Sequence, residues 1–315
     1  MPTPVSFPRL LSAVLAFVLF GAAPAAARAQ ADSPDQIIHF AGPGGEFIEG
    51  GVWLPTAGDG SPRPLVVISH GNSGWYRGHS DTAEALTTAG FVVASLTHPG
   101  DNYQDQSRGL RLTGRAPQLS ALIDYMTETG AGPGAIDDTR IGAFGFSAGG
   151  FTVTSIIGGV SDPGAIRAHC AAQPEVFACR LVAMFGGLDL ATWRPETGDG
   201  RVKAAVIAAP AFGLAFTDQS LASVIVPVQL WQAADDRILP SPWNAEPVRD
   251  RLGGTVDYHR VENAGHYDFL TPCAAEMRTA MPELCTSAPG FDRAGFKVVF
   301  NAEVVRFFRA ALGRP

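Results

Sequence analysis

The segment RIGAFGFSAGG, residues 140–150, constrains the fold more than any other part of the 315-residue chain. An apolar run ends at Ser147, which has Gly145 two places before it and Gly149 two places after it. A continuous apolar run is typical of a strand buried on both faces of a parallel sheet. The residues that follow, 147–159, favour a helix. Because glycines let a strand and a helix pack closely, we expect Ser147 at the tip of a sharp strand-to-helix turn.

Strands and helices alternate through most of the chain. Further buried strands are predicted at 64–70, 90–100, 203–210, 226–234 and 255–263, and helices at 79–90, 116–130 and 295–312. Residues 36–55 favour an antiparallel entry hairpin. This order predicts an α/β fold, with a mainly parallel sheet, helices on both faces and right-handed crossovers. Residues 160–200 fit the alternation poorly and are interpreted as a small insertion or cap near the strand ends. No linker divides the chain, so 30–315 is expected to be a single domain.

The first 29 residues have the pattern of a secretory signal peptide. Arg9 precedes an apolar run over 10–20, and the small-residue stretch Ala27-Arg28-Ala29 follows. The run is shorter than the roughly 20 residues that a bilayer requires. We expect cleavage after Ala29 and a secreted or periplasmic protein without a stable membrane anchor; an uncleaved anchor is the alternative.

Charge and cysteine content limit the possible partners. The formal net charge is −7 and the chain has no basic run, so nucleic acid is not an expected partner. The cysteines are Cys170, Cys179, Cys273 and Cys285. An even number in an exported chain favours disulfides. Three pairings are possible; Cys170–Cys179 and Cys273–Cys285 are favoured because each closes a short loop. A zinc site is the alternative, but the spacings fit no C-x-x-C pattern, and no metal or cofactor is expected.

A serine hydroxyl becomes an effective nucleophile when a base accepts its proton. Seven histidines are available, and His266 is the best placed because it follows the last predicted strand in a loop with Gly265. His70 and His98 also end strands and could approach the site. The base needs a carboxylate to orient it. Asp236 is the favoured residue, four places before Pro240, and Asp235 is the alternative. The chain order Ser147, Asp236, His266 is the order of an α/β-hydrolase triad.

A hydrolytic serine also needs backbone N–H groups that stabilise an oxyanion. Ala148, which follows the serine, is expected to supply one donor. The segment SHGNSG, residues 69–74, is expected to supply the other through Asn72. Trp75 and Tyr76 lie just beyond the same strand and are expected to contact substrate. For His98 and Asp101, in the sequence HPGDN, a structural role in the loop is favoured over a catalytic one.

Five stretches together resemble the α/β-hydrolase superfamily, and within it the dienelactone hydrolase-like branch. They are LVVISHGNSG, GFVVASLTHPGDN, RIGAFGFSAGG, WQAADDRILP and NAGHYDF. The layout is also similar to platelet-activating-factor acetylhydrolases and bacterial polyester hydrolases. The resemblance implies hydrolysis of a small-molecule or polymeric ester without cofactor or metal. Dienelactone hydrolase itself has a cysteine nucleophile where this chain has Ser147, and this difference favours ordinary carboxylic esters.

The expected activity is therefore that of a secreted serine hydrolase, which cleaves carboxylic esters through an acyl-enzyme on Ser147. Two other hypotheses remain open at this point. The same triad could serve a peptidase or amidase, or the scaffold could be an inactive binding protein. The oligomeric state is not predicted.

Overall fold

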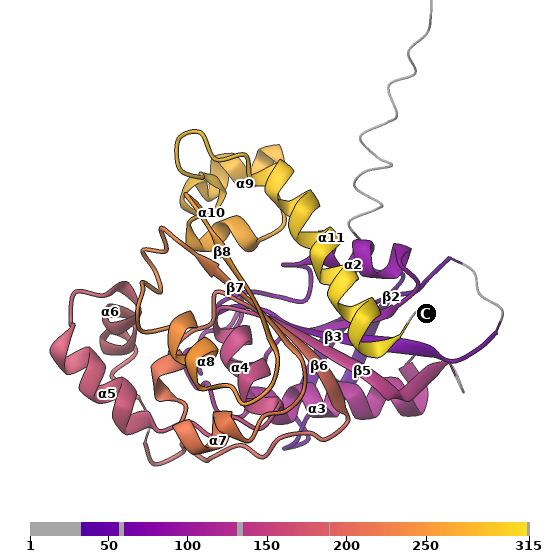
Figure 1. Ribbon diagram of the computed structural model, residues 1–315, viewed down its shortest axis with the longest axis horizontal. Helices are drawn as coiled ribbons and strands as arrows, with labels where there is room; N and C mark the ends of the chain where they lie inside the picture. The colour runs from indigo at the N-terminus through magenta and orange to yellow at the C-terminus, as the bar shows by residue number, and fades with distance from the viewer. Residues whose placement is uncertain (1–32, 57–59, 131–134, 189, 314–315) are drawn as a thin grey trace, which may run out of the picture.

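The computed structural model describes residues 33–56, 60–130, 135–188 and 190–313, and the predicted signal peptide, 1–29, lies outside them. In the described residues, eight strands form one sheet in the order β1-β2-β4-β3-β5-β6-β7-β8. The strands are β1 (Gln36–Ala41), β2 (Phe47–Trp53), β3 (Arg63–Ser69), β4 (Val92–Leu96), β5 (Ile136–Phe146), β6 (Val202–Ala208), β7 (Val228–Ala233) and β8 (Val256–Val261). Figure 1 shows this sheet passing through the middle of the molecule, with helices on both sides.

The pairing of the strands confirms a mainly parallel sheet. β1 and β2 form the predicted antiparallel hairpin, and β2 is also antiparallel to β4. Every pairing from β4 across to β8 is parallel. The carboxyl ends of these parallel strands therefore lie at one edge of the sheet, where ligands collect in α/β proteins.

Helices cover both faces of the sheet. α2 (Ser80–Thr88) and α11 (Arg293–Leu312) pack on one face and on each other. α3 (Arg115–Tyr125), α4 (Ala148–Ile156) and α8 (Ala245–Arg251) pack on the other. Shorter helical elements are η1 (Met126–Gly130), η2 (Gly213–Ala215), α7 (Asp218–Ala222) and η3 (His266–Phe269). Within the described ranges, no helix combines the length and the apolar character needed to cross a membrane.

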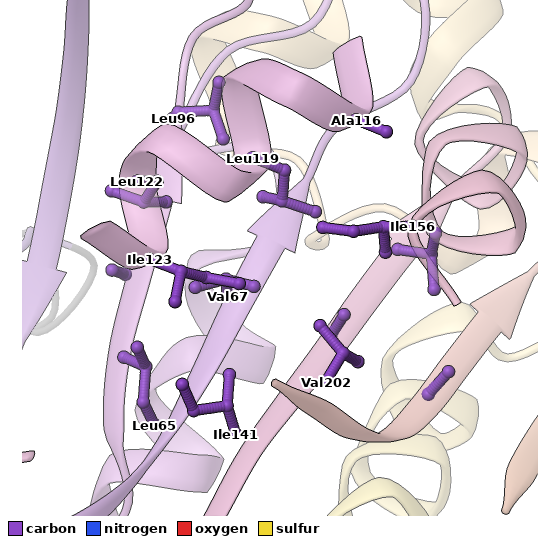
Figure 2. Packing of buried hydrophobic residues seen from close by; sticks show 14 of the residues in the cluster. Leu65, Val67, Leu96, Ala116, Leu119, Leu122, Ile123, Ile141, Ile156 and Val202 are labelled. Atoms are coloured by element: carbon purple, nitrogen blue, oxygen red, sulfur yellow. The ribbon is translucent and has the colours of Figure 1, made fainter. Parts of the chain in front are cut away.

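The core has two layers because side chains alternate along each strand. Leu65 and Val67 of β3 point towards the α3 and α4 face, whereas the intervening Val66 and Ile68 belong to the α2 and α11 face. Figure 2 shows the first layer, with Leu119 of α3 packed near the strand residues. This burial on both faces explains why the strands appear in the sequence as continuous apolar runs.

The segment 160–200 contains two helices, α5 (Pro163–Ala172) and α6 (Phe177–Met184), joined by a disulfide between Cys170 and Cys179. Trp193 of this segment packs against Phe151 of α4, with ring centroids 6.2 Å apart. The segment thus lies against the helix that begins directly after Ser147.

A second disulfide lies near the C-terminus of the chain. It joins Cys273 to Cys285 and encloses α9 (Ala275–Ala280) and α10 (Pro282–Cys285). Both disulfides have the pairing that the sequence favours, and each closes a local loop.

Candidate active site

Ser147 lies in a strained turn between β5 and α4. Its backbone has φ 57° and ψ −118°, a region that a residue with a side chain rarely occupies. The Ser147 N–H donates to the carbonyl of Ala208 over 3.0 Å, and its own carbonyl accepts from Ala211. These bonds to the residues at and beyond the end of β6 hold the strained backbone in place. The side chain is placed at the carboxyl end of the sheet.

Two glycines make this turn possible. A Cβ atom at Gly145 would lie 2.1 Å from the carbonyl oxygen of Gly149, and one at Gly149 would lie 1.9 Å from that of Ser69. Backbone atoms cannot approach a Cβ this closely, so β3, β5 and α4 can pack together here only because both residues lack one.

The structure brings His266 and Asp236 to the same edge. His266 begins η3, after β8, and its Nε2 lies 3.0 Å from the Ser147 Oγ. Its Nδ1 lies 2.7 Å from Asp236 Oδ2, beyond the end of β7. Asp236 Oδ1 accepts from the N–H groups of Ile238 and Leu239, at 2.9 and 2.7 Å, so the carboxylate is fixed. Ser147, His266 and Asp236 thus form a hydrogen-bonded chain, and all three side chains are buried. In this arrangement the imidazole can accept the proton of the Ser147 hydroxyl.

The alternative acid, Asp235, has an exposed side chain, while its backbone N–H donates to the carbonyl of Ala264 over 3.0 Å. The geometry therefore selects Asp236 as the partner of His266.

The two alternative histidines have other partners. His70 Nδ1 donates to the carbonyl of Gly71 over 2.6 Å, and its Nε2 accepts from the N–H of His98 over 3.0 Å. The ring of His98 lies between Ser69 Oγ, at 2.8 Å, and Gln118 Oε1, at 2.6 Å. Burial, reinforced by the charge of Arg115, lowers the pKa of His70 to about 3 and that of His98 well below its usual value. Both rings are neutral structural groups that do not contact Ser147.

Two unpaired backbone donors lie beside the serine. Gly71 packs so closely that a Cβ there would be 3.2 Å from the Ser147 Cβ, which brings the neighbouring Asn72 to the site. Throughout the described part of the chain, neither the Asn72 N–H nor the Ala148 N–H has a hydrogen-bond acceptor. Ala148 is also the first residue of α4, where the N–H groups and the positive end of the helix dipole favour negative charge.

The two predicted substrate contacts lie in different environments. Trp75 is partly exposed, and its ring meets that of Tyr103 with centroids 5.2 Å apart. Tyr76 is only 5% exposed and packs against β2, where a Cβ at Gly51 would be 2.8 Å from its ring. Tyr76 is therefore packed in the core beside β2, and a contact of its side chain with substrate stays a prediction.

Two aromatic neighbours of the His266 imidazole were not predicted from the sequence. The ring of Phe146 lies 4.8 Å from that of His266, and the ring of Tyr267 lies 5.3 Å from it. Burial raises the pKa of the Tyr267 phenol, and the charge of Asp236 adds to this effect. The sequence offered one indication, because Phe146 precedes Ser147 and Tyr267 follows His266. Adjacency in the chain does not show where a side chain points, so it could not identify these contacts. Among the described residues, no three His, Cys, Asp or Glu side chains gather in a way that could hold a metal ion.

The mainly parallel sheet, its antiparallel first strands and the serine turn after β5 define the α/β-hydrolase fold. Solved structures share this fold. A puromycin-hydrolyzing peptidase of Mycobacterium tuberculosis superposes with a TM-score of 0.58 at 16% identity, covering 89% of this chain and 39% of that one. A 2,6-dihydroxy-pseudo-oxynicotine hydrolase superposes with a TM-score of 0.53 at 12% identity, covering 88% and 68%. At these identities the likeness concerns the fold alone.

A curated relative is similar in sequence as well. The bis(hydroxyethyl) terephthalate hydrolase of Streptomyces coelicolor is 26% identical over 223 residues, which are 70% of this chain and 56% of that protein. The chain thus spans little more than half the length of this relative. No protein-family model matches the chain.

Proposed function

We propose that this protein is a serine hydrolase that cleaves carboxylic esters through an acyl-enzyme on Ser147. The observation that carries the proposal is the hydrogen-bonded line from the Ser147 hydroxyl through His266 to Asp236, with distances of 3.0 and 2.7 Å. The spacing is within the range in which a base can take the proton of an attacking hydroxyl.

The reaction would proceed in two halves. Ser147 Oγ attacks the ester carbonyl carbon while His266 Nε2 takes its proton. The imidazolium then gives that proton to the leaving alkoxide as the C–O bond breaks, and Asp236 stabilises the charged imidazole. In the second half, His266 takes a proton from water while the water oxygen attacks the acyl carbon. The imidazolium then returns that proton to Ser147 Oγ as the bond between the acyl carbon and Oγ breaks, which releases the carboxylic acid and restores the serine hydroxyl.

The tetrahedral intermediate of each half carries a negative charge on the former carbonyl oxygen. We assign its stabilisation to the N–H groups of Asn72 and Ala148, which have no other acceptor in the described residues. Loss of one such donor typically lowers the rate by roughly 10²–10³.

The relative and the site together support a carboxylic ester as the substrate class. The similar protein from Streptomyces coelicolor is named for an aromatic diester, so bis(hydroxyethyl) terephthalate is the first substrate to try. Trp75, beside the Asn72 turn, is a candidate contact for such a ring. Within the superfamily, we place the chain in the dienelactone hydrolase-like branch, with the serine in place of cysteine. The 160–200 segment would act as a cap at the strand ends.

We also propose that the protein is exported. The predicted signal peptide and the two disulfides support an oxidising compartment, outside the cell or in the periplasm.

The test uses the mature chain and its Ser147→Ala variant, with the exposed Ser223→Ala as a matched control. All three proteins are assayed on p-nitrophenyl esters of increasing acyl length and on bis(hydroxyethyl) terephthalate. We expect Ser147→Ala to lower kcat by about 10⁶, as in other serine triads, and Ser223→Ala to leave it unchanged. Full activity in Ser147→Ala would refute the proposal.

Two further assays separate the remaining hypotheses. Turnover of aminoacyl anilides in preference to esters would identify a peptidase or amidase. A fluorophosphonate probe should label Ser147 in the wild type, whereas an inactive binding scaffold would not react.

A further inference from the structure

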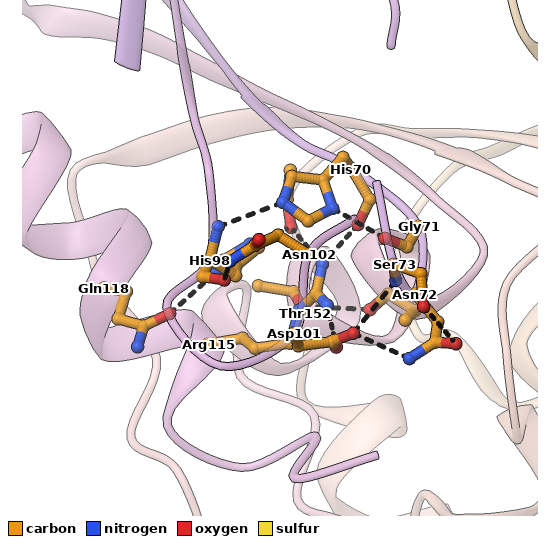
Figure 3. A network of polar contacts seen from close by, with 12 residues as sticks. His70, Gly71, Asn72, Ser73, His98, Asp101, Asn102, Arg115, Gln118 and Thr152 are labelled. Carbon is orange, nitrogen blue, oxygen red and sulfur yellow. Dashed lines mark hydrogen bonds and ion pairs between the residues drawn. The ribbon is translucent and has the colours of Figure 1, made fainter. Parts of the chain in front are cut away.

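A buried ion pair lies behind the predicted oxyanion site. Arg115, at the start of α3, and Asp101, in the loop after β4, are each 2% exposed. Arg115 Nη1 donates to Asp101 Oδ2 over 2.5 Å. Figure 3 shows this pair at the centre of a network that reaches the 70–73 turn and Thr152. The HPGDN stretch predicts a structural role for Asp101 in its loop, whereas no motif points to Arg115.

One arm of the network holds the turn that contains Asn72. Asp101 Oδ1 accepts from the side-chain amide of Asn72 over 2.6 Å and from the Ser73 N–H over 3.0 Å. Arg115 Nη2 donates to the carbonyl of His70, on the other side of the turn. Ser73 has φ 57°, so the turn adopts a conformation that a non-glycine residue avoids without such support.

The other arm holds the first turn of α4. Arg115 Nε donates to the Thr152 Oγ1 over 3.1 Å. The same hydroxyl donates to the carbonyl of Ala148 over 3.0 Å. A single guanidinium therefore connects the segment that carries the Asn72 N–H to the segment that carries the Ala148 N–H.

We propose that Arg115 and Asp101 are positioning residues that fix the Asn72 and Ala148 N–H groups relative to each other, so that both can bind one oxyanion. The guanidinium is suited to this role because its donors form a rigid planar fork, which a flexible lysine ammonium lacks. A buried ion pair adds little net stability compared with apolar residues, so stability alone gives weak reason for one here. The inference rests on the proposed function, since it needs an oxyanion to form.

The test compares variants that release one arm at a time. Asp101→Asn weakens the tie to the turn, and Thr152→Val removes the hydroxyl that ties Arg115 to α4. Asn72→Ala is the second variant for this arm. It removes only a partly exposed side chain, so we expect it to fold even where Asp101→Asn does not. Arg201→Gln is the matched control, because it breaks an arginine–aspartate pair at the start of β6, at the opposite edge of the sheet.

For Asp101→Asn and Asn72→Ala we expect kcat to fall by about 10–10², because a misplacement of about 1 Å costs on the order of 10² in rate. KM should change little, because the ester ground state does not need the oxyanion contact. Thr152→Val should show the same pattern to a smaller extent. Affinity for a trifluoromethyl ketone, which forms a charged tetrahedral adduct on serine, should fall by the same factor as kcat.

Four results would decide against the proposals. Folded Asp101→Asn or Asn72→Ala with unchanged kcat and ketone affinity would overturn the positioning role while leaving the proposed function intact. So would a raised KM at constant kcat, or an equal loss of kcat in Arg201→Gln. A wild type that neither hydrolyses esters nor reacts with a fluorophosphonate would overturn the proposed function, and this inference with it.

Discussion

The buried carboxyl of Glu196 should make the stability of this protein fall as pH rises. Glu196 lies in the 160–200 segment, is 8% exposed, and accepts from the Gly114 N–H at the N-terminus of α3. Burial raises the pKa of Glu196 from 4.5 to about 7, against the opposing effect of the Gly114 hydrogen bond. The folded state therefore holds this proton more tightly than the unfolded state does.

The direction and size of the effect follow from linkage. Stability is greatest while the carboxyl is protonated in both states, below about pH 4.5, and is lost as pH rises towards 7, where the folded state must also ionise. A pKa difference of about two and a half units corresponds to at most about 3 kcal/mol. Glu196→Gln keeps the shape of the side chain and an acceptor oxygen but cannot ionise. The variant should therefore not lose this stability as pH rises.

The measurement is urea unfolding at about pH 5 and about pH 8 for the wild type, for Glu196→Gln and for the exposed control Glu175→Gln. The stability of Glu196→Gln relative to the wild type should increase by up to about 3 kcal/mol between the two pH values, because shared groups cancel in the difference. The control should show no such change. If the free energy of unfolding of Glu196→Gln relative to the wild type did not change with pH, or fell as pH rises, the reasoning would be refuted.

Two other substitutions test the packing around the site. Gly149→Ala would place a Cβ 1.9 Å from the carbonyl of Ser69, so it should abolish activity and destabilise the fold by several kcal/mol in urea unfolding, while Gly44→Ala, with open space around it, should have little effect. Lys297→Met would leave the largely buried Asp81 without the ammonium that lies 3.3 Å away, so it should lower the free energy of unfolding by about 3–5 kcal/mol. Adding Asp81→Asn to Lys297→Met should restore much of that stability; a double variant no more stable than the single one would show that the ion pair is not the cause.

The strands were predictable because they are buried on both faces. Each buried run left a continuous apolar signal, and the predicted strands match β3 to β8 closely. β4 and β5 are the exceptions in length. β4 (Val92–Leu96) is shorter than the predicted 90–100, and β5 begins at Ile136 and not near residue 140. In β5, residues 137–139 are polar, and the pairing of Ile136 with Arg63 precedes an irregularity in register. An apolar-run criterion cannot detect such an extension.

The helices of the 160–200 segment were harder to predict because tertiary packing holds them. α5 does carry a local signal, since Asp162 caps it by accepting from the Gly164 N–H and Pro163 occupies its first position. α6 has no side-chain cap and is only eight residues long. Its buried Ala178 and Val182 pack in the same cluster as Phe151 and Trp193, which the sequence does not place near one another.

The positions of Ser147, Asp236 and His266 in the fold were predictable because the ends of parallel strands converge. The supporting residues were not, because Arg115 contacts the 70–73 turn, and Glu196 contacts the start of α3, across separations that no motif spans. Tyr76 shows that side-chain direction is also hard to predict from the sequence. A residue just beyond a strand end can face either the cleft or the core, and its sequence position does not distinguish the two.

The serine and the imidazole that contact each other are 119 residues apart in the chain, and the imidazole and carboxylate are 30 apart. No short fragment can hold them together, and β5, β6, β7 and β8 must all be in register before the hydroxyl meets its base. Under the proposed chemistry, the rate at which a refolding sample regains reactivity towards a fluorophosphonate would therefore report the assembly of β5 to β8. The recovered reactivity of Ser147 would serve as a kinetic probe of the folding of this half of the sheet.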